Sequence, residues 1–248
     1  MFVSLHLKRK KMKKNLIISL LAMVLMPFGA YAQKVDPLAY YADDNGFEKS
    51  TTSISEGQAP LAVTFRSNPT NMDGYSPSYE WHFRKMDKSE ASGGGYQELF
   101  VRYEEDTDYT FMESGTYNIV QKTRLEQDGA ELDSVTITIT ILDSYLDYPN
   151  ALSPNGDGWN DTFAPKKGWR SIVKFHGMIL NRWGQKIFEW HDPAVEWDGK
   201  YNGKTVKDGV YFLNVNATGA DGHEYHIRKD INVLSRSLGE GGSSSTTP

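Results

Sequence analysis

Hydrophobic and polar residues alternate with a period of two along several stretches of the chain. In residues 135–142, β-branched apolar residues alternate with threonine, and residues 61–65, 79–83 and 117–119 alternate in a similar way. This pattern predicts strands that place one face on a core and the other in water. Stretches with the helical period of 3.6 residues are scarce. The chain is therefore expected to be built from strands.

Asp-Gly and Asn-Gly pairs, which favour tight turns, recur between these stretches. They lie at residues 73–74, 128–129, 198–199, 202–203, 208–209 and 221–222. Short strands separated by such turns are typical of β-sandwiches. We predict an all-β protein with two Ig-like β-sandwich domains in tandem, residues 37–143 and 146–236. The boundary falls near Asp143 to Tyr148, where the alternation stops and a run of Asn, Pro, Gly and Asp begins.

The first 32 residues have the pattern of a secretory signal peptide. Six basic residues between positions 8 and 14 precede an apolar run over residues 16–28, and Ala30-Tyr31-Ala32 follows. This order predicts cleavage before Gln33. The alternative, an uncleaved anchor, is less favoured because the run is short for a membrane span, and no other segment approaches 18 apolar residues. We expect an exported protein with no integral membrane segment after cleavage.

The composition removes several classes of chemistry. Cysteine is absent from the 248 residues, which excludes disulfide scaffolds, cysteine-ligated zinc or iron–sulfur sites and thiol nucleophiles. Residues 33–144 contain 9 basic and 20 acidic residues, whereas residues 145–248 contain 12 of each. Because nucleic acids and anionic membranes attract positive surfaces, neither is an expected partner. Residues 237–248, rich in Gly, Ser and Thr, predict a flexible tail.

Two features of the first domain allow a binding or a structural interpretation. Trp81 could stack on a glycan, but an aromatic residue in an alternating strand more often lies in the core. The acidic run Glu104, Glu105, Asp106 and Asp108 could hold a cation or catalytic carboxylates, or could form a solvated edge that discourages strand pairing. We favour the core for Trp81 and the solvated edge for the acidic run.

The predicted strands of the first domain include the segments Ala59–Phe65, Tyr79–Phe83 and Gly115–Ile119. In this order the three segments resemble the PKD module, an Ig-like β-sandwich of cell-surface and secreted proteins. The Gly-Asp-Gly turn that the family has after its Trp-x-Phe strand is replaced here by residues 84–87. The resemblance implies an adhesive module that binds a surface protein or a glycan, while a binding site that depends on that turn is in doubt.

The second domain carries five motif blocks: Tyr148–Phe163, Ile179–Phe188, Glu196–Gly199, Asn202-Gly203 and Lys207–Phe212. In this order they resemble the gliding-motility-associated C-terminal domain, the type B sorting domain of cargo for the type IX secretion system of Bacteroidota. The resemblance implies export across the inner membrane by the signal peptide and then across the outer membrane by the secretion machinery.

Large apolar side chains lie near the ends of the predicted strands in this second domain. Trp183, Trp190 and Trp197 are interpreted as core residues that close the ends of a small sandwich without disulfides.

One loop of the second domain is a candidate metal site. Four oxygen-bearing side chains lie within seven residues: Asn155, Asp157, Asn160 and Asp161. This spacing partly matches that of a calcium-binding loop, but the bidentate glutamate that follows in such loops is missing here. The alternative is an Asx-turn network in which the same side chains bind the backbone. The sequence suggests no cofactor other than calcium, and the Asx network is the favoured interpretation.

The sequence does not predict an enzyme or a histidine metal site. It contains neither a G-x-S-x-G elbow nor an H-E-x-x-H motif. His82, His176 and His191 each stand alone along the chain. We predict a non-catalytic protein of the cell surface or the medium, cargo of the type IX secretion system. The alternative is a structural accessory of the outer-membrane secretion or gliding-motility apparatus.

Overall fold

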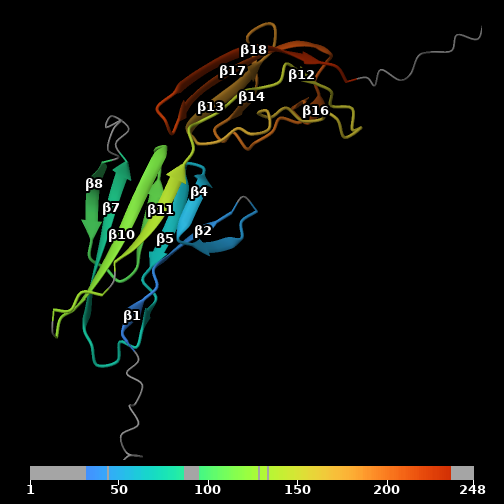
Figure 1. The fold of residues 1–248 in the computed structure, drawn as a ribbon. Helices are drawn as coiled ribbons and strands as arrows, with labels where there is room; N and C mark the ends of the chain where they lie inside the picture. The colour runs from blue at the N-terminus through green and yellow to red at the C-terminus, as the bar shows by residue number, and fades with distance from the viewer. Residues whose placement is uncertain (1–31, 44, 87–94, 128, 133, 236–248) are drawn as a thin grey trace, which may run out of the picture.

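The computed structural model describes residues 32–43, 45–86, 95–127, 129–132 and 134–235. The predicted tail and the predicted signal peptide, apart from Ala32, lie outside this part of the chain. The described residues form strands, turns and loops in two groups of sheets (Figure 1). The prediction of an all-β chain with tandem Ig-like sandwiches is therefore confirmed. No helix among the described residues is long and apolar enough to cross a membrane.

The N-terminal domain is a sandwich of a five-stranded and a four-stranded sheet. Their orders are β4-β11-β10-β7-β8 and β3-β2-β5-β9, and a short β1-β6 pair is added. Neighbouring strands run antiparallel, apart from the parallel pair of β4 and β11. The strands are β1 (Lys34–Val35), β2 (Leu38–Ala42), β3 (Glu48–Thr51), β4 (Ser53–Gly57), β5 (Leu61–Arg66), β6 (Pro69–Thr70), β7 (Pro77–Met86), β8 (Tyr96–Arg102), β9 (Thr107–Phe111), β10 (Gly115–Leu125) and β11 (Val135–Ile141).

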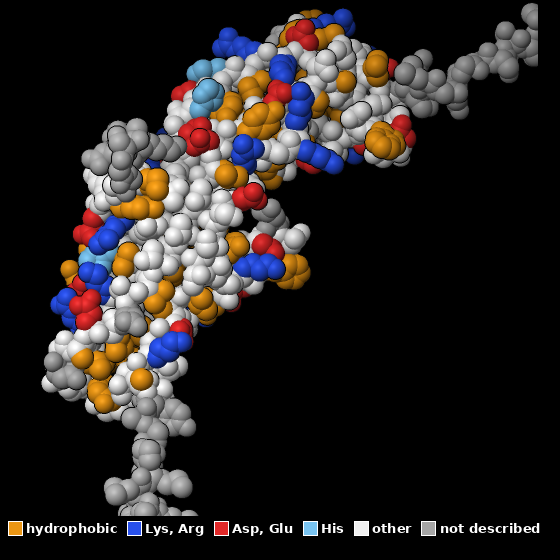
Figure 2. All heavy atoms as spheres, viewed as in Figure 1, with side chains coloured by type: hydrophobic (Ala, Val, Ile, Leu, Met, Phe, Trp, Pro, Cys, Tyr) orange, Lys and Arg blue, Asp and Glu red, His pale blue; other side chains and the backbone are white. Residues whose placement is uncertain are grey.

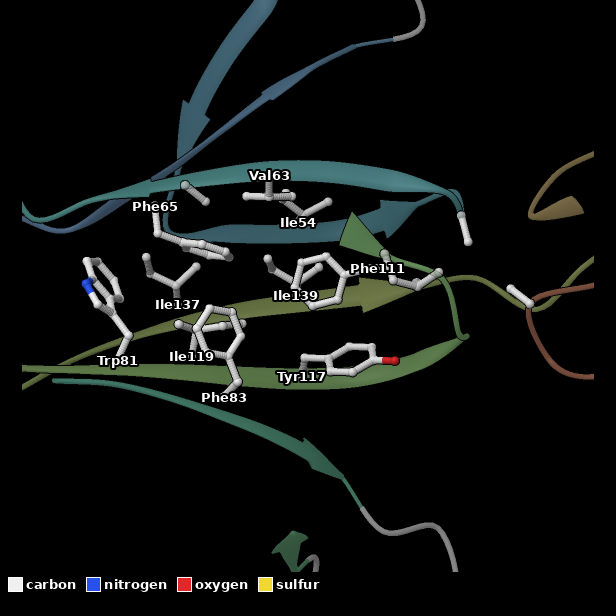
Figure 3. Close-up of a cluster of buried hydrophobic side chains, with 14 residues drawn as sticks. Ile54, Val63, Phe65, Trp81, Phe83, Phe111, Tyr117, Ile119, Ile137 and Ile139 are labelled. Atoms are coloured by element: carbon white, nitrogen blue, oxygen red, sulfur yellow. The ribbon is translucent and has the colours of Figure 1, made fainter. Parts of the chain in front are cut away.

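The core of the N-terminal domain lies between these two sheets, where the alternating residues meet (Figure 3). Trp81 is fully buried, as predicted, and its indole Nε1 donates hydrogen bonds to the carbonyl oxygens of Glu104 and Glu105 at 3.0 and 3.2 Å. Phe65 packs against Trp81 with ring centroids 5.9 Å apart. Alternation in β5, β7, β10 and β11 therefore supplies one continuous apolar layer.

The acidic run lies at an edge of the four-stranded sheet. Its four side chains are exposed, and β9 is the last strand of that sheet. Asp106 Oδ1 accepts the backbone N–H of Ser67 at 3.0 Å, and Glu104 Oε1 accepts the hydroxyl of Thr107 at 2.9 Å. These carboxylates therefore fix the turn before an edge strand, which fits the predicted solvated edge.

The C-terminal domain consists of one five-stranded sheet, β12-β18-β17-β13-β14, and a short β15-β16 hairpin. The core covers one face of this sheet, where loop residues such as Tyr148, Phe163 and Trp197 pack against Ile179 and Leu213. The strands are β12 (Ala151–Leu152), β13 (Ile172–Leu180), β14 (Lys186–Trp190), β15 (Lys200–Tyr201), β16 (Lys204–Thr205), β17 (Gly209–Gly219) and β18 (Glu224–Val233).

A few short contacts join the two domains. Ser114 N–H donates to the carbonyl oxygen of Ala220 at 2.9 Å, and Ala59 N–H donates to Ser171 Oγ at 3.3 Å. Ala220 is also a member of the N-terminal hydrophobic cluster, against which Val173 packs. The C-terminal domain therefore contributes side chains to the edge of the N-terminal core.

Candidate functional site

The motif blocks of the C-terminal domain converge at one end of its sheet. Leu180, the last residue of β13, pairs with Phe212 near the start of β17, and Gly209 pairs with Val233 at the end of β18. The loops over residues 153–163, 181–185 and 196–208 therefore lie at this end, which we call the distal end. Figure 1 shows β12 and β16 there, away from the N-terminal domain. The contacts with the N-terminal domain come from the opposite end, where β13 begins and β17 ends.

The loop over residues 155–161 is held by its own carboxylates. Asp161 Oδ1 accepts the backbone N–H groups of Asn155 and Gly156 at 3.0 and 2.6 Å, and its Oδ2 accepts that of Gly158 at 2.7 Å. Asp157 Oδ1 accepts the N–H of Trp159 at 2.8 Å. Each carboxylate therefore closes a local turn.

Asn155 and Asp157 also bind each other in this loop. Asn155 Nδ2 donates to Asp157 Oδ2 at 2.9 Å, and Asn155 Oδ1 accepts the N–H of Asp157 at 3.1 Å. The N–H groups of Gly156 and Gly158 lower the pKa of the Asp161 carboxyl below its ordinary value. The loop thus has the Asx-turn network that was one of the two interpretations. Asn160 contributes its backbone, whose carbonyl oxygen accepts the N–H of Ser153 at 2.7 Å. Calcium binding by Asn155, Asp157, Asn160 and Asp161 stays a prediction.

Replacing Asp161 with alanine is expected to lower the urea midpoint of unfolding more than replacing Asp157 does, because three backbone N–H groups lose their acceptor. Asp157→Ala removes the acceptor of one backbone N–H and should cost less. Urea denaturation of both variants measures the difference. Equal losses would contradict the central position of Asp161 in this network.

Melting in millimolar calcium and in chelator tests the calcium hypothesis separately. An ion that binds the folded state alone raises the melting temperature, and Asp157→Asn should abolish that gain. The Asx network alone predicts the same melting temperature in both conditions, and that result would retire the calcium site.

The turn over residues 181–185 presents a tryptophan to solvent. Asn181 Oδ1 accepts the N–H groups of Trp183 and Gln185, both at 3.0 Å, and this closes the turn between β13 and β14. Trp183 is 75% exposed, and the guanidinium of Arg182 lies 4.3 Å from its ring centroid. The prediction of a core position for Trp183 is therefore wrong, whereas Trp190 and Trp197 are buried as predicted. Trp183 occupies a turn tip rather than a strand position that faces the core.

The Trp-Asp-Gly segment anchors the distal end to the core. Trp197 is 1% exposed, its Nε1 donates to the carbonyl oxygen of Lys200 at 2.9 Å, and its backbone pairs with Phe163. Gly199 has a φ of +73°, and a Cβ there would lie 2.8 Å from two carbons of Pro154. Only glycine fits this close approach of two motif blocks.

A groove of about 400 Å³ lies between the 181–185 turn and the β15-β16 hairpin. Aromatic and basic residues line it, among them Trp183, Tyr201, Arg182, Lys204 and Lys207. Gln185 Nε2 donates to the hydroxyl of Tyr201 at 3.2 Å, which links the two walls. In Figure 2, basic side chains are spread over the visible face of the C-terminal domain. The distal end thus combines exposed indole rings with positive charge.

The expectation that His176 and His191 stand alone is also wrong. Their rings stack with centroids 4.9 Å apart, and His176 Nε2 lies 2.9 Å from Glu189 Oε1. The pairing of β13 with β14 brings these two histidines together, although they are 15 positions apart in the sequence. Their spacing along the sequence did not reveal this contact. His82 likewise has partners, since its ring nitrogens lie 2.7 and 3.1 Å from carboxylate oxygens of Glu98 and Glu80.

Three solved structures resemble the chain at low identity. They are SGBP-B of the Bacteroides ovatus mixed-linkage glucan utilization locus in complex with a mixed-linkage heptasaccharide (14% identity, TM-score 0.25), chicken CNTN1 FN1-FN3 domains (11%, 0.33) and dimeric latent PorU from Porphyromonas gingivalis (10%, 0.24). The matches cover 73%, 77% and 82% of this chain, and 42%, 71% and 20% of the respective structures. The chain thus spans less than half of the Bacteroides ovatus structure. All three TM-scores lie below 0.5, so these structures do not indicate a function.

The curated proteins contain no match to this chain. The match to a family model concerns the C-terminal domain: residues 146–228 match the CHU_C type IX secretion signal domain. This segment contains all five motif blocks and the distal end that they form. The resemblance of the C-terminal domain to a type IX sorting domain, predicted from those blocks, is thereby confirmed.

Proposed function

We propose that the chain is a non-catalytic cargo of the type IX secretion system, with the N-terminal domain as its binding or adhesive module. The observation that carries this proposal is the CHU_C signal domain at residues 146–228, which implies export to the cell surface or the medium. The N-terminal Ig-like sandwich is then the part that reaches a surface protein or glycan. The PKD-like segments and the acidic charge of this domain support a role in binding to neutral or basic ligands.

We further propose that the distal end contacts the outer-membrane secretion machinery. Trp159 and Trp183 are 78% and 75% exposed. Tryptophan is usually largely buried and is enriched at the centres of protein interfaces, so two exposed indole rings at one end of a domain favour an interaction surface there. The basic groove beside Trp183 adds Arg182 and Lys204 to the same end. Because this end points away from the N-terminal domain (Figure 1), secretion machinery bound there would leave the N-terminal domain free to bind its ligand.

Surface proteolysis of intact cells, with and without a working translocon, tests the cargo proposal. A cargo is cleaved by external protease only when the translocon works, and it accumulates in the periplasm when export is blocked. A structural accessory, the alternative, stays in the envelope and is protected in both strains. Protection of the chain from external protease in both strains would overturn the cargo proposal.

The Trp159→Ala/Trp183→Ala double variant is expected to reduce the exported fraction at least about tenfold, because interface tryptophans often contribute 2 kcal/mol or more to binding. Both residues are exposed, so the melting temperature should not fall. A matched control is the Phe47→Ala/Tyr103→Ala double variant, which removes two aromatic rings that are 67% and 71% exposed on the N-terminal domain. Equal export of both double variants and the wild type would exclude the distal indoles from recognition.

A further inference from the structure

The edge of the C-terminal sheet carries a His-Glu-His cluster. β13 and β14 pair antiparallel with Gly177 opposite Trp190, so His176 and His191 lie next to each other one residue beyond this pair, where their rings stack. Glu189 lies two residues before His191 and therefore on the same face of the sheet. The strand register, rather than a flexible loop, brings the three side chains together.

The ligand atoms of this cluster are close enough for a single ion. One donor atom from each of His176, Glu189 and His191 lies within 4.8 Å of the other two. His176 Nε2 and Glu189 Oε1 are 2.9 Å apart, and the two imidazole rings are parallel within 9°. A zinc ion bonds nitrogen and oxygen at about 2.0 to 2.2 Å, so two ligands of one ion lie up to roughly 4 Å apart. The donor atoms, which lie within 4.8 Å of one another, therefore need to approach by less than about 1 Å to reach this range.

We propose that His176, Glu189 and His191 form a binding site for a divalent transition metal, with zinc as its representative. Two imidazoles and one carboxylate are a donor set that zinc, nickel and copper accept, whereas calcium and magnesium prefer oxygen ligands. Three protein ligands leave a coordination position for water or for a further ligand. The metal would join the edge strand β14 to β13.

The surroundings of Glu189 fit this arrangement. Lys186 holds Oε2 of the carboxylate through an ion pair, which leaves Oε1 directed at His176 as a single ligand atom. His176 and Glu189 have side chains that are 36% and 34% exposed, and His191 lines a groove of about 840 Å³ between the domains. An ion therefore has an open path to the site.

Another histidine of the same chain provides a matched control. His82 lies between Glu80 and Glu98 on β7 and β8, at distances that match an ion pair. Among the described residues, no second histidine joins His82 in a group of possible metal ligands. The two sites therefore share a His-Glu contact, but His82 is not in a group of three possible metal ligands among the described residues, whereas His176, Glu189 and His191 form one.

Isothermal titration of the purified, untagged protein with zinc chloride tests the proposal. We expect saturable binding of one zinc per chain. The affinity for zinc should fall at least about tenfold in each of three variants: His176→Ala, His191→Ala and Glu189→Gln. Loss of a residue that only hydrogen-bonds to a metal ligand already lowers metal affinity by about 10- to 100-fold. His82→Ala should bind zinc as the wild type does. Lys186→Met, which frees Oε2 of Glu189, should bind at least as tightly.

A second measurement keeps the test independent of the variants' folding. In nitrogen-15 spectra of the wild-type histidine side chains, zinc should shift two imidazoles. One of the two shifted signals should be absent from the spectrum of the folded His176→Ala variant and the other from that of the folded His191→Ala variant. Unchanged affinity in the three ligand variants, or the same loss in His82→Ala, would overturn the site. Absence of saturable zinc binding by the wild type would overturn it as well.

Discussion

Replacing Trp197 with alanine is expected to lower the free energy of unfolding of the C-terminal domain by about 3 to 5 kcal/mol. The indole is fully enclosed and packs against Phe188 and Tyr211, with ring centroids 6.4 and 5.9 Å away. Its removal leaves a cavity and deprives the carbonyl oxygen of Lys200 of its donor. Urea denaturation followed by circular dichroism measures the loss.

Trp183→Ala is the matched control for this prediction, because it removes the same side chain from an exposed turn at the same end of the domain. Its effect on stability should stay within about 0.5 kcal/mol. Under the proposed function the two variants separate folding from recognition. Trp197→Ala would lose export together with stability, whereas Trp183→Ala, alone or with Trp159→Ala, would lose export alone. A stable Trp197→Ala domain would show that the segment at residues 196–199 does not anchor the distal end.

Most of the fold follows from local pattern. The alternation of apolar residues and threonine in residues 135–142 predicts β11, because a hydrophobic period of two residues is that of a strand with one buried face. The buried position of Trp81 follows from the same rule, since Tyr79 and Phe83 lie on its side of the strand. The sorting domain could be predicted because its motif residues are turn residues and aromatic residues in a fixed order, and such an order is visible without coordinates.

The parts that sequence reasoning missed depend on which strands are neighbours. Trp183 and Trp197 have similar polar and glycine neighbours in the sequence, yet one lies at a turn tip and the other under the sheet. His176 and His191 meet because β13 pairs with β14 in a register that the sequence does not state. Ala220 completes the edge of the N-terminal core from the other domain. Such long-range contacts carry no periodic signal along the chain.

Replacing Trp81 with alanine is expected to lower the free energy of unfolding of the N-terminal domain by about 3 to 5 kcal/mol. The side chain is fully buried beside Phe65, and the carbonyl oxygens of Glu104 and Glu105 lose their shared donor. For a domain of this size, the melting temperature of the N-terminal domain should fall by more than about 10 °C. Tyr103→Ala, which removes an exposed ring from the neighbouring segment, should leave that temperature unchanged.

The same variant tests whether the two predicted domains, residues 37–143 and 146–236, fold separately. Among the described residues, polar links across the junction include those from Ser114 to Ala220, from Ala59 to Ser171 and from Arg170 to Asp143, and each contributes about 1 kcal/mol. The transition of the C-terminal domain in calorimetry should therefore move far less than that of the N-terminal domain. If the halves are independent, then under the proposed function a C-terminal domain that stays folded would still direct export of the Trp81→Ala chain. One merged transition that shifts as a whole would instead show that Ala220 and its neighbours join both domains into a single cooperative unit.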